Sequence, residues 1–119
     1  MPARTVGRIT SRAAFAELQR SRARGSSGPV GALFSPADEG TPGLFPQVGY
    51  AIGSRCGTAV VRNRLRRRAR AVVRAEAPNL RLGSYLVRLG PGAASLTPGE
   101  FRVDVATALR RAGQASEGR

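Results

Sequence analysis

The stretch AVVRNRLRRRAR, residues 59–70, constrains this chain more than any other, because six of its twelve residues are arginine. An α-helix turns by about 100° per residue, and at that spacing the aliphatic and basic residues separate. One side carries the aliphatic residues Val61, Leu65, Ala69 and Val72. Thr58 is a good N-cap and Pro78 stops a helix. The pattern predicts a helix of about eighteen residues.

The opposite arc of this predicted helix is cationic. It carries Arg62, Arg64, Arg66, Arg67, Arg70 and Arg74. Residues 58–75 contain seven arginines and no acid, whereas a solvated helix face usually mixes charges of both signs. Arg68 is the exception, because its angle places it on the apolar side. Either its side chain extends along the edge of that side to reach solvent, or the helix is less deeply buried than a core helix. We therefore expect an anionic partner against the cationic arc.

The whole chain shares this bias toward positive charge. Its 119 residues carry a formal net charge of +13, and all 20 basic residues are arginine. A polyanion offsets the self-repulsion of such a domain, and guanidinium groups bind phosphate bidentately and stack on bases. Nucleic acid is therefore the predicted partner. A membrane is disfavoured, because the sequence has no run of 18 apolar residues and its basic segment lacks the Trp and Phe of interfacial helices.

Few side chains here suit catalysis. Histidine is absent, Cys56 is the only cysteine and the 7 acidic residues are scattered. Histidine bases, thiolate metal sites and clustered carboxylates are thus largely excluded. We expect no catalytic residue and no metal site on the polypeptide. A lone cysteine forms no internal disulfide, which fits a cytoplasmic protein.

The first half of the chain predicts a helix and two strands. Ser11 is placed to cap a helix over residues 11–22, and Ile9 can pack against its start. The GSSGP sequence, residues 25–29, predicts a turn. Residues 30–36 and 46–53 then read as the two strands of a hairpin with a long tip.

The second half predicts one more strand and one more helix. A strand begins at Ser84, and Thr97 with Glu100 forms a capping box for a helix that Gly113 ends. The elements together indicate a small antiparallel or mixed sheet with helices packed on it. We expect a single RNA-binding domain over residues 1–112 and a disordered tail over residues 113–119.

The second predicted strand has one apolar face and one face of small residues. Its small face carries Gln47, Gly49, Ala51 and Gly53, which alternate with larger apolar residues. Small residues on a strand let another backbone approach closely. Two interpretations stay open: a bulge or a second packing layer, or a sheet face left free for an extended ligand.

The stretch GTAVVRNRLRRRAR, residues 57–70, resembles the signature of the bacterial ribonuclease P protein family. In that family a basic pair, a glycine and Ala-Val precede Arg-Asn-Arg, a branched apolar residue and further basic residues. The resemblance runs from about Ile9 to Ala112. It implies an α+β fold, a small α/β sandwich of order α-β-β-β-α-β-α, whose mixed sheet has a left-handed βαβ crossover like domain 2 of ribosomal protein S5.

The resemblance also implies a function. The catalytic centre of such an enzyme lies in a large partner RNA that uses Mg²⁺ and cleaves precursor tRNA to free its mature 5′ end. The protein is an accessory subunit and is expected to be inactive alone. The implied partners are the catalytic RNA and precursor tRNA, with no membrane and no obligatory protein partner, and the implied location is the cytoplasm.

Residue roles follow from the motif of that family. The Arg-Asn-Arg helix contacts the catalytic RNA, and a cleft beside it holds the single-stranded 5′ leader. The implied RNA-binding residues are Arg55, Arg62, Asn63, Arg64, Arg66, Arg67, Arg70 and Arg74. The implied leader-binding residues are Phe15, Phe34, Gln47, Gly49 and Ala51. Both phenylalanines also fit ordinary core packing, and the Asn63 amide could hydrogen-bond a base or sugar edge.

Several positions depart from the family pattern. Gln19 stands where a second cleft aromatic is common, Ser54 replaces one of the basic pair, and Cys56 and Arg68 occupy sites that are usually aliphatic. These departures bear on leader contacts and helix packing. The alternative function is that of a basic ribosomal protein or RNA chaperone without a cleavage role. A stand-alone nuclease is disfavoured by the missing histidine and clustered acids.

Overall fold

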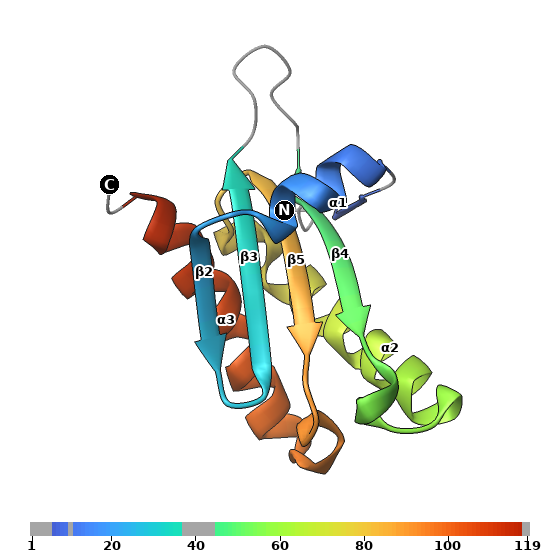
Figure 1. The fold of residues 1–119 in the computed structure, drawn as a ribbon. Helices are drawn as coiled ribbons and strands as arrows, with labels where there is room; N and C mark the ends of the chain where they lie inside the picture. Colours follow the sequence, from blue (N-terminus) through green and yellow to red (C-terminus); the bar gives the residue numbers. More distant parts are fainter. Residues whose placement is uncertain (1–5, 10, 37–44, 118–119) are drawn as a thin grey trace.

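A computed structural model describes residues 6–9, 11–36 and 45–117 of the chain. Its strands are β1 (Gly7–Arg8), β2 (Ala23–Ser27), β3 (Val30–Pro36), β4 (Gln47–Ile52) and β5 (Gly83–Leu89). Its helices are α1 (Arg12–Gln19), α2 (Ala59–Glu76) and α3 (Pro98–Glu117), with short 3-10 turns η1 (Ser54–Cys56), η2 (Ala77–Asn79) and η3 (Ala93–Ser95). The expected order α-β-β-β-α-β-α is present, and β1 precedes it (Figure 1).

The strands form one mixed five-stranded sheet in the order β1-β4-β5-β3-β2. β4 runs parallel to β1 and β5, whereas β3 runs antiparallel to β5 and β2. The predicted hairpin between residues 30–36 and 46–53 is therefore wrong, because β5 lies between these strands. Most of its predicted tip, residues 37–44, lies outside the described residues.

The connection from β4 through α2 to β5 is left-handed. Figure 1 shows β4 and β5 pointing the same way, with β5 to the left of β4 and α2 behind the sheet. A right-handed connection would place α2 on the near face, as in almost all units of this kind. The crossover implied by the family resemblance is thus confirmed.

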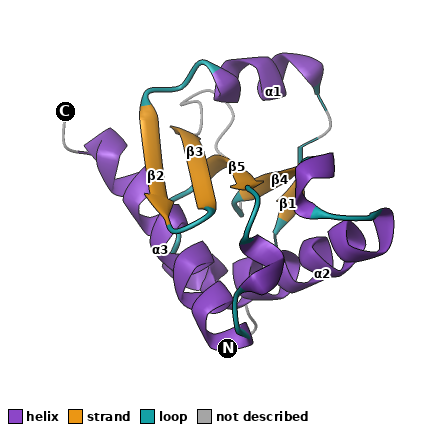
Figure 2. Cartoon of the chain, turned by 60° about the horizontal axis from the view of Figure 1, so that its bottom comes forward, coloured by secondary structure: helices purple, strands orange, loops and turns teal. Residues whose placement is uncertain are grey.

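The sheet has α1 on one face and α2 with α3 on the other (Figure 2). The main core lies on the α2–α3 side, where Phe34, Tyr85 and Val48 form one row across three strands. The rings of Phe34 and Tyr85 lie 4.7 Å apart between centroids, a favourable distance for an aromatic pair. α3 adds Phe101, Val105 and Leu109 to this core.

A smaller core lies under α1. Ile9, Leu18, Leu33 and Leu86 are buried there, with Phe15 packed at their edge. Ser11 caps the helix as predicted, because its Oγ accepts a hydrogen bond from the Ala14 N–H at 3.3 Å. The helix ends at Gln19, earlier than predicted.

β2, like the short β1, is a strand that the sequence pattern did not reveal. Gly25, Ser26 and Ser27 were assigned to a turn, but all three pair with β3. The turn is confined to Gly28 and Pro29, and Gly28 has a φ of 57°, which glycine adopts without strain. A Cβ atom on Gly25 would lie 2.5 Å from the Ala112 nitrogen, so this glycine lets α3 pack directly against β2.

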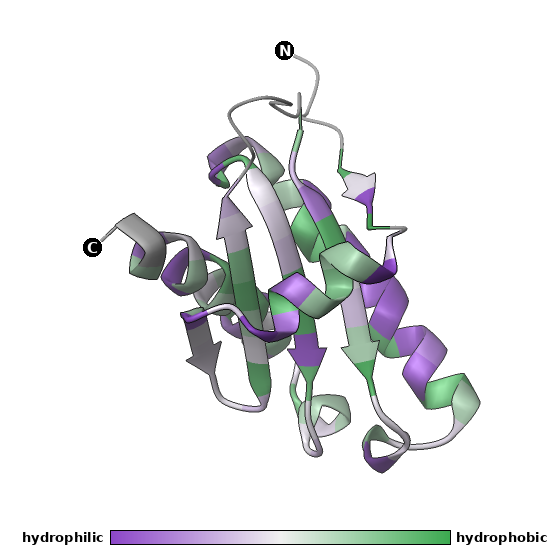
Figure 3. Cartoon of the chain, turned by 45° about the horizontal axis from the view of Figure 1, so that its top comes forward, coloured by the Kyte–Doolittle hydropathy of each residue, from purple (hydrophilic) through white to green (hydrophobic). Residues whose placement is uncertain are grey.

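α2 matches its prediction. The Thr58 Oγ1 accepts a hydrogen bond from the Val61 N–H at 3.3 Å, and the helix ends at Glu76. Its buried residues are Leu65, Ala69, Val72 and Val73. Arg68 is exposed and lies beside a hollow over Val72 and Phe101, so its side chain extends along the edge of the apolar side. Figure 3 shows hydrophilic residues along the outer surface of α2.

α3 begins as predicted and ends later. Thr97 and Glu100 form the capping box, with their reciprocal hydrogen bonds at 2.9 and 3.1 Å. The helix continues through Gly113 to Glu117, so the predicted end at Gly113 and a disordered segment over 113–117 are wrong. Gly113 is buried, and a Cβ atom there would lie 3.4 Å from the Tyr85 hydroxyl oxygen. Gly113 therefore lies within the helix and does not cap it. Residues 118–119 lie outside the described part.

Candidate nucleic-acid interface

The cationic face of α2 is open to solvent. Asn63, Arg64, Arg67, Arg70 and Arg74 are exposed. Arg62 and Arg66 are half-buried, and the Nε atom of Arg62 is buried with no hydrogen-bond partner in the described chain. No described carboxylate lies within ion-pair distance of any α2 arginine; the ion pair seen nearby joins Glu76 to Arg110 of α3 at 3.8 Å. The guanidinium groups are therefore available to an external anion.

Asn63 positions one of these cations. Its Oδ1 accepts a hydrogen bond from Arg66 Nη1 at 3.0 Å. The Asn63 side chain is exposed, and its amide nitrogen remains available as a donor. Asn63 thus presents a neutral hydrogen-bonding group within the basic face and also holds Arg66 in place.

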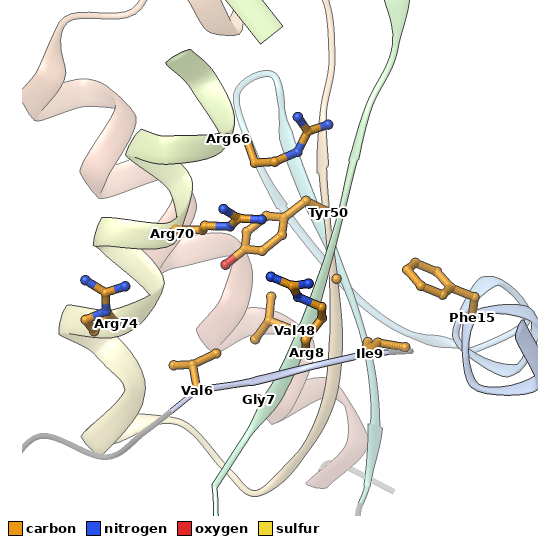
Figure 4. Close-up of a pocket in the computed structure, with 11 residues that line it drawn as sticks. Val6, Gly7, Arg8, Ile9, Phe15, Val48, Tyr50, Arg66, Arg70 and Arg74 are labelled. Carbon is orange, nitrogen blue, oxygen red and sulfur yellow. The ribbon is translucent and has the colours of Figure 1, made fainter. Parts of the chain in front are cut away.

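A cleft lies between β1, β4 and α2, and we call it the edge cleft (Figure 4). Its volume is about 680 Å³, within the range of small-ligand pockets. It is lined by residues 6–9, Phe15, residues 48–50, Arg66, Arg70 and Arg74. Its lining combines apolar and aromatic side chains with the arginines, and this combination suits a nucleotide chain.

Tyr50 stands in the middle of the edge cleft. Figure 4 shows Arg70 reaching over the Tyr50 ring from α2, with Arg74 further along the same helix and Val6 and Arg8 below the ring. The Arg70 guanidinium lies 5.9 Å from the centre of the Tyr50 ring, a cation–π distance. Burial raises the pKa of Tyr50 to about 12, although the charges of Arg70 and Arg74 act to lower it. The phenol therefore stays protonated at neutral pH.

Two of the predicted leader-binding residues meet at this cleft. The Phe15 ring lies against Gly49, where a Cβ atom would be only 2.9 Å from Phe15 Cζ. Gln47 and Ala51 share the face of Gly49 on β4 and are exposed. Ala51 lines a neighbouring shallow hollow rather than the edge cleft. The small-residue face is thus partly packed by Phe15 and partly open.

Phe34 is the predicted leader-binding residue that the structure does not bring to this site. Its side chain has 0% exposure and lies on the opposite face of the sheet, against Tyr85. A fully buried ring has no surface on which a base could stack. Of the two interpretations of Phe34, core packing is the one that fits.

The remaining predicted RNA-binding residues lie on more than one side of α2. Arg55 is exposed on η1, just before α2. Arg64 and Arg67 line a shallow hollow on another side of α2, together with Arg68. Arg66, Arg70 and Arg74 line the edge cleft itself. The arginines of α2 therefore line two separate hollows, the edge cleft and the shallow hollow beside Arg68.

Two residues of the edge cleft were missed from the sequence. Tyr50 was predicted only as part of the apolar face of its strand, where it does lie, and no role was predicted for Arg8. Because β1 pairs with β4 only at Gln47 and Val48, Tyr50 lies at the uncovered edge of the sheet and is half-buried. The sequence carried one signal of this position: Tyr50 alternates with the aliphatic residues Val48 and Ile52, and a tyrosine usually keeps its hydroxyl near polar surroundings.

The described ranges hold neither a metal-binding cluster nor a helix that could span a membrane. Within residues 6–9, 11–36 and 45–117, no three His, Cys, Asp or Glu side chains come together to hold a metal ion. Over the same ranges, none of the helices combines the length and the apolar character needed to span a bilayer.

Comparison with known proteins identifies the family. The family model for ribonuclease P matches residues 4–113. The ribonuclease P protein component of Thermobifida fusca is 38% identical over 108 residues, which cover 87% of this chain and 74% of that protein. The component from a Synechococcus strain is 40% identical over 81 residues, 67% of this chain but only 61% of the relative's length.

Solved structures share the fold. The ribonuclease P protein of Staphylococcus aureus matches with a TM-score of 0.74 at 17% identity, covering 89% of this chain and 88% of that one. The protein of Thermotoga maritima matches with a TM-score of 0.73 at 18% identity, covering 87% and 96%. With a family model that spans nearly the whole sequence, the chain belongs to the bacterial ribonuclease P protein family.

Proposed function

We propose that this chain is the protein subunit of ribonuclease P, binding the catalytic RNA and the 5′ leader of precursor tRNA. One observation carries the proposal within this family: a helix face of arginines without a described carboxylate partner borders an open cleft. Such a face is repulsive by itself and becomes favourable against RNA phosphates. The subunit assists removal of the leader, and the RNA performs the cleavage.

The α2 helix is the surface we assign to the catalytic RNA. Arg62, Asn63 and Arg64 match the family motif at the start of this helix, and the further arginines extend the same face. Guanidinium groups at this density lower the repulsion between two RNA molecules. The Asn63 amide adds a contact that does not depend on charge.

The α1 side of β4 is the surface we assign to the leader. Phe15 is half-buried, so part of its ring can stack on a base, and Ala51 continues an exposed strip of small residues. Stacking on an aromatic surface tolerates any base, which suits an enzyme that accepts many precursors. Phe15, Gln47, Gly49 and Ala51 remain the proposed leader-binding residues.

Mg²⁺ belongs to the partner RNA in this proposal. The described chain offers no cluster of ligands for such an ion, and no step of the mechanism is assigned to a metal on the protein. By holding the leader and screening phosphate charge, the protein favours Mg²⁺ occupancy in the RNA. The complex is placed in the cytoplasm.

Cleavage of precursor tRNA by the cognate RNA at low Mg²⁺ tests this function. Addition of the protein should restore cleavage under conditions where the RNA alone is nearly inactive, and the protein alone should cleave nothing. RNA binding without any stimulation of cleavage would favour a ribosomal protein or RNA chaperone instead. A series of leaders of increasing length should show stimulation that reaches a plateau after several nucleotides.

A further inference from the structure

We propose that the edge cleft binds one RNA phosphate between the Tyr50 hydroxyl and the guanidinium groups of Arg70 and Arg74. This inference rests on the proposed function, since it takes RNA as the ligand. It adds a specific phosphate contact that lies outside the Arg-Asn-Arg motif and outside the small-residue face of β4.

The Tyr50 hydroxyl is a hydrogen-bond donor that the described residues leave without an acceptor. None of the described residues forms a hydrogen bond with it, although the side chain is half-buried. A half-buried hydroxyl usually finds a partner. Because burial raises its pKa to about 12, the phenol keeps its proton and can donate. A ligand that supplies a hydrogen-bond acceptor would satisfy the Tyr50 hydroxyl.

The charges around Tyr50 favour an anionic acceptor. Arg8, Arg66, Arg70 and Arg74 all line the same cleft, and no described carboxylate lies within ion-pair distance of them. The Arg70 guanidinium already lies over the ring, 5.9 Å from its centre. Arginine binds phosphate through two parallel N–H groups. A phosphate in this position would receive donors from the strand and from the helix together.

The shape of the cleft suits a nucleotide unit better than a free ion. β1 pairs with β4 only at Gln47 and Val48, so the described strands leave the edge of β4 uncovered from Gly49 onward. Val6 and Val48 provide an apolar wall beside Tyr50, and the cleft volume is about 680 Å³. A sugar and base attached to the bound phosphate can rest on this wall.

Phosphate-ethylation interference tests the inference directly, because ethylation removes the charge from one phosphate at a time. The holoenzyme with wild-type protein is assembled on ethylated, end-labelled catalytic RNA in one arm and on ethylated, end-labelled precursor tRNA in the other. We expect ethylation of one phosphate to reduce binding by about tenfold, the size of a charge-assisted hydrogen bond. The arm that contains this phosphate identifies which RNA enters the cleft.

Tyr50→Phe is the informative variant, because it removes only the hydroxyl. The same ethylation should cost the Tyr50→Phe holoenzyme less than it costs the wild type, about threefold instead of tenfold, since the share of the hydroxyl is already lost while both guanidinium groups remain. Arg70→Gln should behave like Tyr50→Phe, whereas Arg111→Gln removes an equal charge on α3 and should keep the full interference signal. Identical interference profiles for wild-type and Tyr50→Phe proteins in both arms would overturn the inference.

The two proposals fail in different ways. If the wild-type protein does not stimulate cleavage at low Mg²⁺, the proposed function fails. If it stimulates cleavage but Tyr50→Phe leaves every phosphate signal unchanged, only the edge-cleft inference fails. Circular dichroism of each variant confirms that the fold is retained.

Discussion

At the scale of one residue, a substitution of Asn63 distinguishes specific RNA recognition from an effect of total charge. Asn63→Ala leaves the net charge unchanged, but it removes the exposed amide and the acceptor that holds Arg66 Nη1 at 3.0 Å. We expect its affinity for the catalytic RNA to fall by about fivefold, as for one lost hydrogen bond. Filter binding measures this effect.

The matched control for Asn63 is Arg111→Gln. Arg111 lies on α3, where its Nη1 donates to the Ser26 carbonyl at 2.8 Å, away from the edge cleft. This variant loses a full charge, yet we expect less than about twofold loss of affinity. Equal losses from both variants would show that only total charge matters.

The ionisation of Tyr50 makes a prediction about stability at high pH. The unfolded chain releases the phenol proton near pH 10, whereas the folded chain holds it to about 12. Between these values the unfolded state binds fewer protons, so the free energy of unfolding falls as the pH rises. Urea unfolding at pH 9 and 11 should show a smaller fall for Tyr50→Phe than for the wild type. The same fall in both proteins would contradict the assignment.

Single residues were predicted well where their neighbours lie close in sequence. The caps Ser11 and Thr58 and the buried Leu65 follow from local spacing alone. Tyr50 does lie on the predicted apolar face with Val48 and Ile52, and the cleft role of Phe34 came from the family resemblance. The alternation of a strand says which residues share a face but not how completely that face is covered. β3 lies inside the sheet and buries Phe34, whereas β4 lies near an edge and leaves Tyr50 half-exposed.

At the scale of elements, α2 predicts a steep salt dependence of RNA binding. If about six of its guanidinium groups meet phosphates, log affinity should fall with log salt at a slope near −5 for duplex RNA. Arg66→Gln should make the slope shallower by about 1, and Arg111→Gln should leave it unchanged. A slope that responds equally to both variants would exclude α2 as the RNA-binding surface.

The docking of α1 on β4 depends on Gly49. A Cβ atom there would lie 2.9 Å from Phe15, so Gly49→Ala forces this ring or the helix outward. We expect a loss of about 1–3 kcal/mol in the free energy of unfolding, measured by urea titration. Gly49→Ala combined with Phe15→Leu should recover part of it.

Gly53→Ala is the control for Gly49→Ala, because no described residue other than its two chain neighbours comes within 4 Å of a Cβ at position 53. Its stability should change by no more than about 0.5 kcal/mol. If both alanine variants were equally stable, Phe15 could not be packed against Gly49 in the way described.

The elements themselves were predictable where their periodicity is strong. α2 and the start of α3 have apolar spacing and caps that fix them from local sequence. β2 was missed because Ala23–Ser27 has no apolar alternation, and it is a strand only because β3 and α3 pack against it. The end of α3 was misplaced because Gly113 is a buried residue inside the helix and not its cap.

At the scale of the whole molecule, strand order is what local sequence could not supply. The predicted hairpin assumed that consecutive strands are neighbours, as most are. Here β5 enters between β3 and β4 after a left-handed crossover, which places α2 beside the edge of β4. That placement creates the edge cleft. The family resemblance supplied the crossover, and no periodicity in the residues indicates it.

The central claim is that the arginine face of α2 lets the protein support RNA-catalysed cleavage at low Mg²⁺. Single-turnover cleavage of precursor tRNA, titrated with Mg²⁺, tests it in three mixtures: catalytic RNA alone, with wild-type protein, and with the double variant Arg66→Gln/Arg70→Gln. The wild-type protein should shift half-maximal cleavage to lower Mg²⁺, and the double variant should lose most of that shift. A full shift with the double variant, or none with the wild type, would contradict the account.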